Sequence, residues 1–265
     1  MVSFCYDNSM QLKSIQWNIG GGKIRKTKSV ASDPSSYAIE GMDYVIQKIV
    51  DANPDIVSLQ ETHTKGDYSQ VELIAKALGY KYWVNDAYAD SHVSEGFKLG
   101  QGIISRYPIS NHSFSLFFNP HFKAKWDDGS IVTSHDKGLT KCTLTMEGRD
   151  LCVMTLHAIP FRPFGVNPLS DDAKEVREDM QKKLQNGKPL VLLQGDFNFN
   201  EKSLKALLPE LLTSGMEEAI QETTTTPKGR FYDHVVYKGF RLLHTGVDKS
   251  ALTDHYPIES VFEFE

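Results

Sequence analysis

The sequence has few cysteines, and their spacing fits neither a disulfide framework nor a zinc site. Only Cys5, Cys142 and Cys152 occur in 265 residues, an odd number with no Cys-x-x-Cys pair. A disulfide-rich secreted scaffold and a thiolate zinc centre are therefore excluded. The N-terminus also lacks a basic start followed by an apolar run, so we expect a cytoplasmic protein in a reducing compartment.

Long apolar runs and an excess of positive charge are missing as well. No stretch approaches the ~20 apolar residues of a membrane-spanning helix, so no membrane span is expected. Lysine and arginine number 29 against 34 aspartates and glutamates, a formal net charge of -5. This charge argues against a protein that grips nucleic acid through net positive charge, but it leaves room for a local basic groove. The peptidase and esterase motifs His-Glu-x-x-His and Gly-x-Ser-x-Gly are absent.

What the sequence does contain is an alternation of short apolar strands with amphipathic helices. Helical spacing of apolar residues predicts helices within 36–52, 69–78 and 170–183. Strand patterns are found at 12–19, 56–59, 102–105, 114–118, 131–133, 141–146, 151–156, 190–193, 235–237 and 258–264. Many strands with few helices predict an α/β (α+β) protein of two stacked sheets with helices outside. Without a Pro/Ser-rich linker, we expect one domain over 1–265, with 1–11 as an N-terminal extension.

Lone polar residues lie where the apolar strands end. Asn18, Glu61, His157 and Asp196 each follow such a strand, and the pairs Asp233-His234 and Asp254-His255 precede two others. One strand-end Asp or Asn is usually a turn former, but a repeated set predicts a shared cleft. Carboxylate and amide oxygens suit Mg²⁺, and paired Asp and His suit proton transfer. Together these groups favour displacement at phosphorus over peptide hydrolysis.

An ordered series of short motifs is similar to the endonuclease/exonuclease/phosphatase superfamily from about residue 12 to the C-terminus. The motifs are Gln16-Trp17-Asn18, Leu59-Gln60-Glu61-Thr62, Ser105-Arg106-Tyr107-Pro108, Leu156-His157-Ala158, Gly195-Asp196-Phe197-Asn198, Asp233-His234-Val235 and Thr253-Asp254-His255-Tyr256-Pro257. The resemblance implies a four-layer αββα sandwich of the deoxyribonuclease I-like kind, with a catalytic cleft at one edge.

The same resemblance implies roles for individual residues. Glu61 matches the principal metal-binding glutamate, Asn18 the asparagine beside the metal and phosphate, and Asp254 a second carboxylate on the metal side. Asp196 and Asn198 match the pair that positions the attacking water and a phosphate oxygen. His255, oriented by Asp233, matches the superfamily's histidine and aspartate pair.

His157 divides the branches of the superfamily. The stretch Leu156-His157-Ala158 resembles deoxyribonuclease I and its relatives, whereas abasic-site endonucleases have a tyrosine-containing motif here. The Pro, Trp, Cys, Asp, Arg block of inositol polyphosphate 5-phosphatases is also missing. Deoxyribonuclease I pairs this histidine with a carboxylate, and the sequence leaves Asp86, Asp90 and Glu95 open as that partner.

Basic and aromatic segments offer weaker signals. A basic run after Asn18 contains Lys23, Arg25, Lys26 and Lys28, of which Lys23 and Arg25 are our candidates for substrate phosphate, together with Arg106. The aromatic residues of 114–126 alternate with lysines and are compatible with base stacking or lipid contact. We favour a hairpin that turns at 127–129 with its aromatic side chains packed inward.

These observations predict a monomeric, magnesium-dependent phosphodiester hydrolase, with Mn²⁺ as a possible substitute, that uses direct in-line attack of water. A nuclease acting on DNA or RNA is the first hypothesis, because the histidine block is deoxyribonuclease-like. The alternative is a phosphatase or phosphodiesterase acting on a lipid head group, an inositol phosphate or another small ester. His255 with Asp233 is expected as general base or charge stabiliser, and His157 as the complementary acid or donor. Sequence leaves open which group, Asp196 included, takes the proton of water.

Overall fold

The computed structural model describes residues 10–26, 37–126 and 128–264. The expected N-terminal extension lies outside these residues, except for Met10 and Gln11, and Gln11 already belongs to the first strand. In the described part of the chain, no helix is long and apolar enough to cross a membrane.

Two sheets form the centre of the molecule. The first has the strand order β16-β17-β1-β4-β7-β6, with β5 paired to β4, and the second has the order β14-β15-β13-β12-β11-β8. The strands of the first sheet are β1 (Gln11–Asn18), β4 (Ile56–Lys65), β5 (Tyr68–Ser69), β6 (Tyr82–Asp90), β7 (Lys98–Ser105), β16 (Phe240–Val247) and β17 (Ile258–Phe264). Those of the second are β8 (Ile109–Leu116), β11 (Gly138–Met146), β12 (Arg149–His157), β13 (Val191–Asp196), β14 (Glu217–Glu218) and β15 (Asp233–Lys238).

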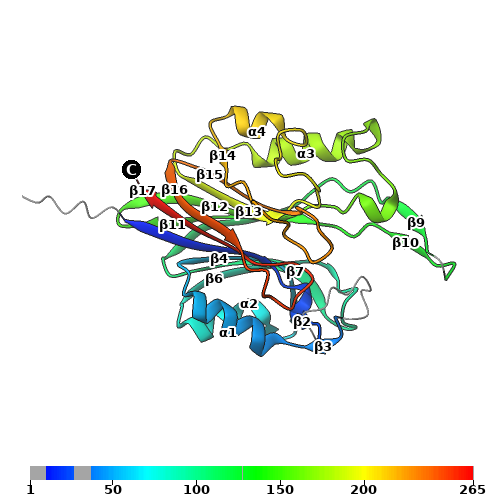
Figure 1. The fold of residues 1–265 in the computed structure, drawn as a ribbon, viewed down its shortest axis with the longest axis horizontal. Helices are drawn as coiled ribbons and strands as arrows, with labels where there is room; N and C mark the ends of the chain where they lie inside the picture. The colour runs from blue at the N-terminus through cyan, green and yellow to red at the C-terminus, as the bar shows by residue number, and fades with distance from the viewer. Residues whose placement is uncertain (1–9, 27–36, 127, 265) are drawn as a thin grey trace, which may run out of the picture.

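Helices cover the outer face of each sheet, which makes four layers (Figure 1). On the first sheet lie α1 (Met42–Ala52) and α2 (Gln70–Leu78), and on the second lie α3 (Lys174–Leu184) and α4 (Pro209–Thr213). Three apolar cores match the three contacts between layers. One joins the sheets, through side chains such as Leu12 and Leu192, and the other two join each sheet to its helices. The expected αββα sandwich is confirmed.

Each sheet contains a strand, helix, strand unit, as the sequence predicted. The strands β1 and β4 pair in parallel around α1, and β12 and β13 pair in parallel around α3. Helix α2 shows the local reasons clearly: the Ser69 side chain accepts a hydrogen bond from the Glu72 backbone N–H at its start, and Gly79 at φ 73° ends it. The helix predicted to begin at Ser170 starts as a single 3-10 turn over Asp171–Ala173 before α3.

The predicted hairpin exists as β9 (Lys123–Lys125) paired with β10 (Ile131–Thr133), and it projects from the body of the molecule (Figure 1). Its turn includes residue 127, which lies outside the described residues. Phe117 is buried, but Trp126 is 55% exposed and Ile131 is 71% exposed. The prediction that the aromatic side chains pack inward is therefore wrong for Trp126, since a two-stranded hairpin has only one covered face, and it is also wrong for Phe118, which is 41% exposed.

Candidate active site

Strand pairing brings the predicted polar residues to one edge of the two sheets. In the second sheet His157 is the register partner of Asp196, which in turn is the partner of Asp233. The first sheet supplies Asn18 at the end of β1, and its side-chain amide donates to Asp196 Oδ2 across the gap between the sheets at 3.0 Å. Because β1 and β13 face one another across the two sheets and both end at this edge, side chains 178 residues apart in sequence come into contact.

Glu61 reaches the cleft through an irregularity in β4. The pairing of β4 with β7 shifts register between Gln60 and Thr62, and Glu61 has a left-handed backbone with φ 52°. A β-bulge of this kind redirects a side chain that would otherwise follow the pleat. The sequence predicted a strand that ends near Glu61, whereas β4 continues to Lys65 with the bulge inside it.

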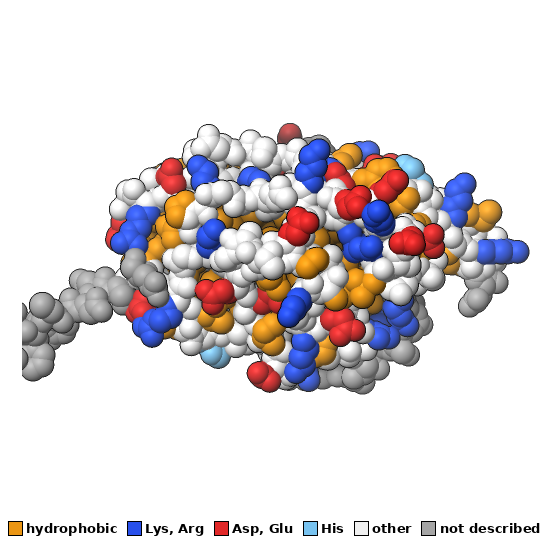
Figure 2. Space-filling model, turned by 90° about the horizontal axis from the view of Figure 1, so that it is seen from above, with side chains coloured by type: hydrophobic (Ala, Val, Ile, Leu, Met, Phe, Trp, Pro, Cys, Tyr) orange, Lys and Arg blue, Asp and Glu red, His pale blue; other side chains and the backbone are white. Residues whose placement is uncertain are grey.

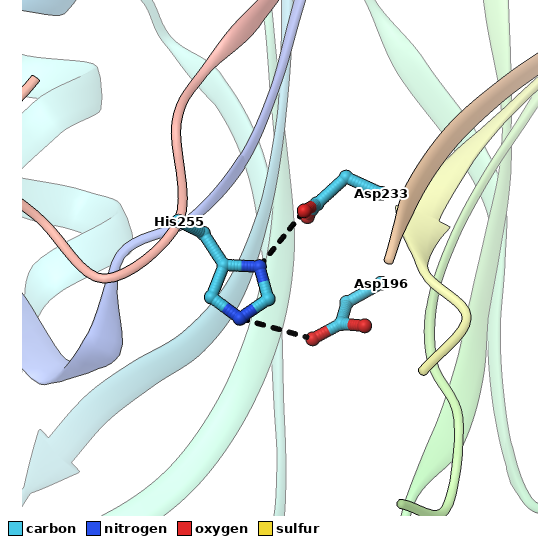
Figure 3. Close-up of side chains that lie close together, drawn as sticks. All are labelled: Asp196, Asp233 and His255. Carbon is cyan, nitrogen blue, oxygen red and sulfur yellow. Dashed lines mark hydrogen bonds and ion pairs between the residues drawn. The ribbon is translucent and has the colours of Figure 1, made fainter. Parts of the chain in front are cut away.

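His255 and Asp233 form the predicted pair, with His255 Nδ1 2.8 Å from Asp233 Oδ2 (Figure 3). The side-chain amide of Gln16 donates to the other oxygen of Asp233 at 2.8 Å, and the Trp17 indole donates to the His255 backbone carbonyl at 3.1 Å. Burial disfavours the imidazolium, but Asp233 and the other carboxylates outweigh this effect and raise the pKa of His255 well above its ordinary value. The Asp233 partner therefore favours the imidazolium form of His255.

Asp196 stands between the two histidines. Its Oδ2 atom is 3.5 Å from His157 Nε2 and 3.7 Å from His255 Nε2 (Figure 3 shows the latter). The Asn198 backbone N–H donates to Oδ1 at 2.8 Å, and Asn198, like Glu61, has a left-handed backbone. Burial raises the pKa of Asp196 to about 7, so this carboxyl group can exchange a proton near neutral pH.

His157 has partners that the sequence did not predict. The Tyr88 hydroxyl and the Lys137 ammonium each lie 3.1 Å from His157 Nδ1. Among the contacts of the described residues, none joins His157 to Asp86, Asp90 or Glu95, the three carboxylates that the sequence offered as its partner. Asp86 bonds to His112 and Thr140, and Asp90 pairs with Lys98 at the surface. Burial, together with the charge of Lys137, lowers the pKa of His157 well below its ordinary value.

Two carboxylates meet in a cavity of about 350 Å³ beside these groups. Glu61 and Asp254 line it together with Gly20, Lys23, Tyr37, His92, Val93 and Lys228. Burial raises the pKa of Asp254, and the negative charge of Glu61 raises it further. Two hard oxygen donors that repel one another in a small polar cavity fit a divalent cation such as Mg²⁺.

A second group of possible metal ligands lies next to this cavity. Asp196, Asp233 and His255 present ligand atoms within 4.8 Å of one another. Both oxygens of Asp233 and Nδ1 of His255 are already used in hydrogen bonds. The Glu61 and Asp254 carboxylates therefore fit a cation better.

Of the residues predicted to contact the substrate phosphate, only some lie at the cavity. Lys23 lines the cavity and pairs with Glu40. Arg25 is 3% exposed and donates to the Ala251 carbonyl, so it supports the segment that carries Asp254. Lys28 lies outside the described residues.

Arg106 lies away from the site, and a phosphate-binding role does not fit it. Its guanidinium donates to Asp55 Oδ1 at 2.8 Å and packs on the Tyr80 ring. Asp55 precedes β4, six residues before Glu61, which is about 20 Å along an extended strand. The motif Ser105-Arg106-Tyr107-Pro108 thus forms the strand-to-turn feature at the opposite end of the sheet.

Tyr88 and Lys137 were missed by sequence reasoning. Tyr88 lies on β6, which is not among the strands predicted from the sequence, because polar residues interrupt its alternation. Lys137 is 3% exposed and immediately precedes β11. A buried lysine in the stretch Ser-His-Asp-Lys-Gly carries no local signal, since lysine in a polar loop is usually solvated.

Comparison with known proteins agrees with the geometry. Residues 15–255 match the model of the Endonuclease/Exonuclease/phosphatase family. No curated protein matches the sequence.

Solved structures with the same fold are nonetheless numerous. An endonuclease/exonuclease/phosphatase from Beutenbergia cavernae is 16% identical with a TM-score of 0.73, covering 96% of this chain and 72% of that one. The catalytic domain of human Nocturnin, with a bound sulfate anion, is 15% identical with a TM-score of 0.65, covering 96% and 95%. A beta toxin from Staphylococcus aureus is 16% identical with a TM-score of 0.63, covering 94% and 99%. At such identities the likeness concerns the fold.

Proposed function

The chain belongs to the endonuclease/exonuclease/phosphatase family, and we propose that it is a metal-dependent phosphodiester hydrolase in which water attacks phosphorus directly. The observation that carries the proposal is the placement of Asp196 between two histidine Nε2 atoms at 3.5 and 3.7 Å, beside a cavity lined by Glu61 and Asp254. Proton transfer and charge stabilisation at phosphorus are thereby available within one cleft.

We assign Asp196 as the general base that accepts the proton of the attacking water. Its pKa of about 7 allows it to accept a proton at neutral pH, and Asn18 and the Asn198 backbone hold its two oxygens in place. His255 suits that role less well, because the Asp233 carboxylate at Nδ1 raises its pKa and favours the imidazolium. Instead, its Nε2–H stabilises negative charge on the phosphate and can protonate the leaving oxygen.

Glu61 and Asp254 would hold the cation, and Mg²⁺ or Mn²⁺ suits their oxygens. Such an ion supplies Lewis-acid stabilisation of charge on the non-bridging phosphate oxygens. Lys23 and Lys228, which line the same cavity, supply fixed positive charge for the substrate phosphate. The face seen in Figure 2 offers less positive charge of this kind, since cationic and anionic side chains are interspersed over it.

Nucleic acid is the first substrate that we propose, since the histidine block is deoxyribonuclease-like. A small or lipid phosphodiester is the second, and one observation favours it. The hairpin of β9 and β10 exposes Trp126 and Ile131, flanked by Lys123 and Lys125. Residues 134–136 connect this hairpin to Lys137 in the site, so its exposed apolar and cationic side chains belong to a segment that continues into the cleft.

A substrate panel separates the two proposals. Supercoiled plasmid, single-stranded DNA, RNA, inositol phosphates and phosphocholine vesicles are compared at equal enzyme in Mg²⁺. If the protein is a nuclease, it nicks plasmid, and its affinity for DNA falls as the salt concentration rises. The slope of log affinity against log salt concentration becomes shallower by roughly 0.9 for each phosphate contact removed, as in Lys23→Ala. Intact plasmid with turnover of an inositol phosphate or lipid rejects the nuclease. No turnover of any member rejects the proposed function.

A further inference from the structure

The two ring nitrogens of His157 face opposite kinds of groups. Nδ1 receives Lys137 Nζ from the segment before β11 and Tyr88 Oη from β6, each at 3.1 Å. Nε2 faces carboxylates, with Asp196 Oδ2 at 3.5 Å and Glu61 Oε1 at 3.9 Å. His157 is 2% exposed, so water does not compete with these groups for its two ring nitrogens.

An ammonium group determines the direction of the hydrogen bond at Nδ1. Burial lowers the pKa of Lys137, and the Glu61 carboxylate, whose Oε1 lies 3.8 Å from Nζ, opposes this shift. A lysine ammonium carries three donors and no acceptor lone pair, and the Tyr88 hydroxyl at the same nitrogen can also donate, so Nδ1 is the acceptor. A proton on Nδ1 would point at the ammonium and leave the Nε2 lone pair facing two carboxylates. A doubly protonated ring would likewise press an N–H against Lys137. Only the neutral ring with its proton on Nε2 satisfies both sides.

We propose that Lys137, assisted by Tyr88, is a positioning residue that holds His157 as the neutral Nε2–H tautomer directed at the Glu61 and Asp196 carboxylates. Carboxylate partners of imidazoles do the opposite, because they accept the Nδ1 proton and favour the imidazolium. His157 is then a neutral hydrogen-bond donor to a phosphate oxygen. The proton for the leaving group falls to His255, the histidine that does have a carboxylate partner.

This mechanistic consequence rests on the proposed function, but the tautomer itself does not. It is read from long-range ¹H–¹⁵N correlation spectra of protein labelled with ¹⁵N-histidine, in EDTA at neutral pH without substrate. The His157 signals are identified by their loss in His157→Gln. We expect one protonated ring nitrogen, Nε2, and an unprotonated Nδ1 that accepts a hydrogen bond. A protonated Nδ1, alone or in a doubly protonated ring, overturns the inference without any variant of Lys137.

The role of Lys137 is tested by three substitutions. Lys137→Met removes the donor and should shift the Nδ1 resonance in the direction of a weaker hydrogen bond, while Lys137→Arg retains a donor and restores it. Lys98→Met is the matched control, since Lys98 is an exposed lysine paired with Asp90 outside the cleft. An Nδ1 resonance that responds equally to Lys137→Met and Lys98→Met contradicts the assignment.

Activity gives an independent second measurement. Lys137→Met should lower kcat on the order of 10-fold or more, with partial recovery in Lys137→Arg. If the predicted tautomer is found and no phosphate ester is hydrolysed, the proposed function fails and the inference on Lys137 stands. If kcat stays within twofold of wild type in Lys137→Met, the positioning role is contradicted.

Discussion

At the residue scale, the cleft gathers groups that are costly to keep in a folded protein. Asp196 and Lys137 are nearly inaccessible to water, and Glu61 and Asn198 have left-handed backbones that cost about 1–3 kcal/mol each. Neighbouring hydrogen bonds offset part of this cost, such as those from Asn18 to Asp196 and from Gln16 to Asp233. Such groups persist where function requires them.

Removal of either cleft histidine should abolish most activity while the fold is kept. We expect His157→Gln and His255→Asn each to lower kcat by on the order of 10²-fold, the usual range for groups that donate or transfer protons. The assay is hydrolysis of the best substrate of the panel, with thermal unfolding measured in parallel. His112→Gln, which alters an exposed histidine paired with Asp86, is the control. Loss of folding in a cleft variant would show that its histidine is structural.

Asp196→Asn should inactivate the enzyme and stabilise it. The folded pKa of about 7 lies above the usual 3.8 of an aspartate, so the folded state binds the proton more tightly than the unfolded state does. Stability is therefore lost as pH rises from about 4 to about 7, and the neutral amide avoids that loss. The melting temperature, measured in EDTA, should exceed that of wild type by more at pH 8 than at pH 5. A difference from wild type that is the same at pH 5 and pH 8 contradicts the raised pKa.

At the scale of elements, the sequence predicts whatever depends on local pattern. Parallel units around α1 and α3 follow from apolar strands joined by amphipathic helices, and the ends of α2 follow from Ser69 and Gly79. The strands β6 and β16 were not predicted, because polar residues interrupt their alternation. The β4 bulge at Glu61 is a tertiary effect of pairing with β7, which no local pattern encodes.

The three glycines after β1 should prove to be a packed element and not a flexible loop. Gly21 has φ 66°, and a Cβ there would lie 2.3 Å from His63 Cε1. The His63 ring is held by Ser91 and stacked on Phe97, so it cannot give way easily. Gly66, at φ 56° with open space around it, is the matched control. We expect Gly66→Ala to cost about 1 kcal/mol of unfolding free energy and Gly21→Ala to cost about 1–3 kcal/mol more, by urea denaturation. Equal losses of unfolding free energy in Gly21→Ala and Gly66→Ala would contradict close packing of Gly21 against His63.

The projecting hairpin should affect hydrolysis only when the substrate is part of a lipid surface. Trp126 is 55% exposed, so Trp126→Ser should leave the melting temperature unchanged. If the substrate is a lipid ester, hydrolysis in vesicles should fall several-fold while hydrolysis of a soluble ester stays constant. Equal effects on both substrates would place Trp126 in the cleft chemistry and contradict a surface role.

At the scale of the whole molecule, two helix-covered sheets stack on one another (Figure 1) and share an apolar core. The cleft lies at the edge where β1, β12 and β13 end. The ordered motifs made this arrangement predictable, because each strand end carried one polar residue. Substrate choice was not predictable in the same way. The segments around the cavity, such as the one that presents His92 and Val93, carry no repeated pattern from which a substrate could be predicted.

Chelation followed by rescue shows whether hydrolysis requires a cation at Glu61 and Asp254. The wild-type protein and Glu61→Gln are treated with EDTA, and hydrolysis of the best substrate in the panel is followed as Mg²⁺ is added back. We predict no turnover in EDTA, full recovery of the wild type, and recovery of Glu61→Gln only at far higher Mg²⁺, because one of two cavity carboxylates is lost. Undiminished hydrolysis by the wild type in EDTA would contradict the account.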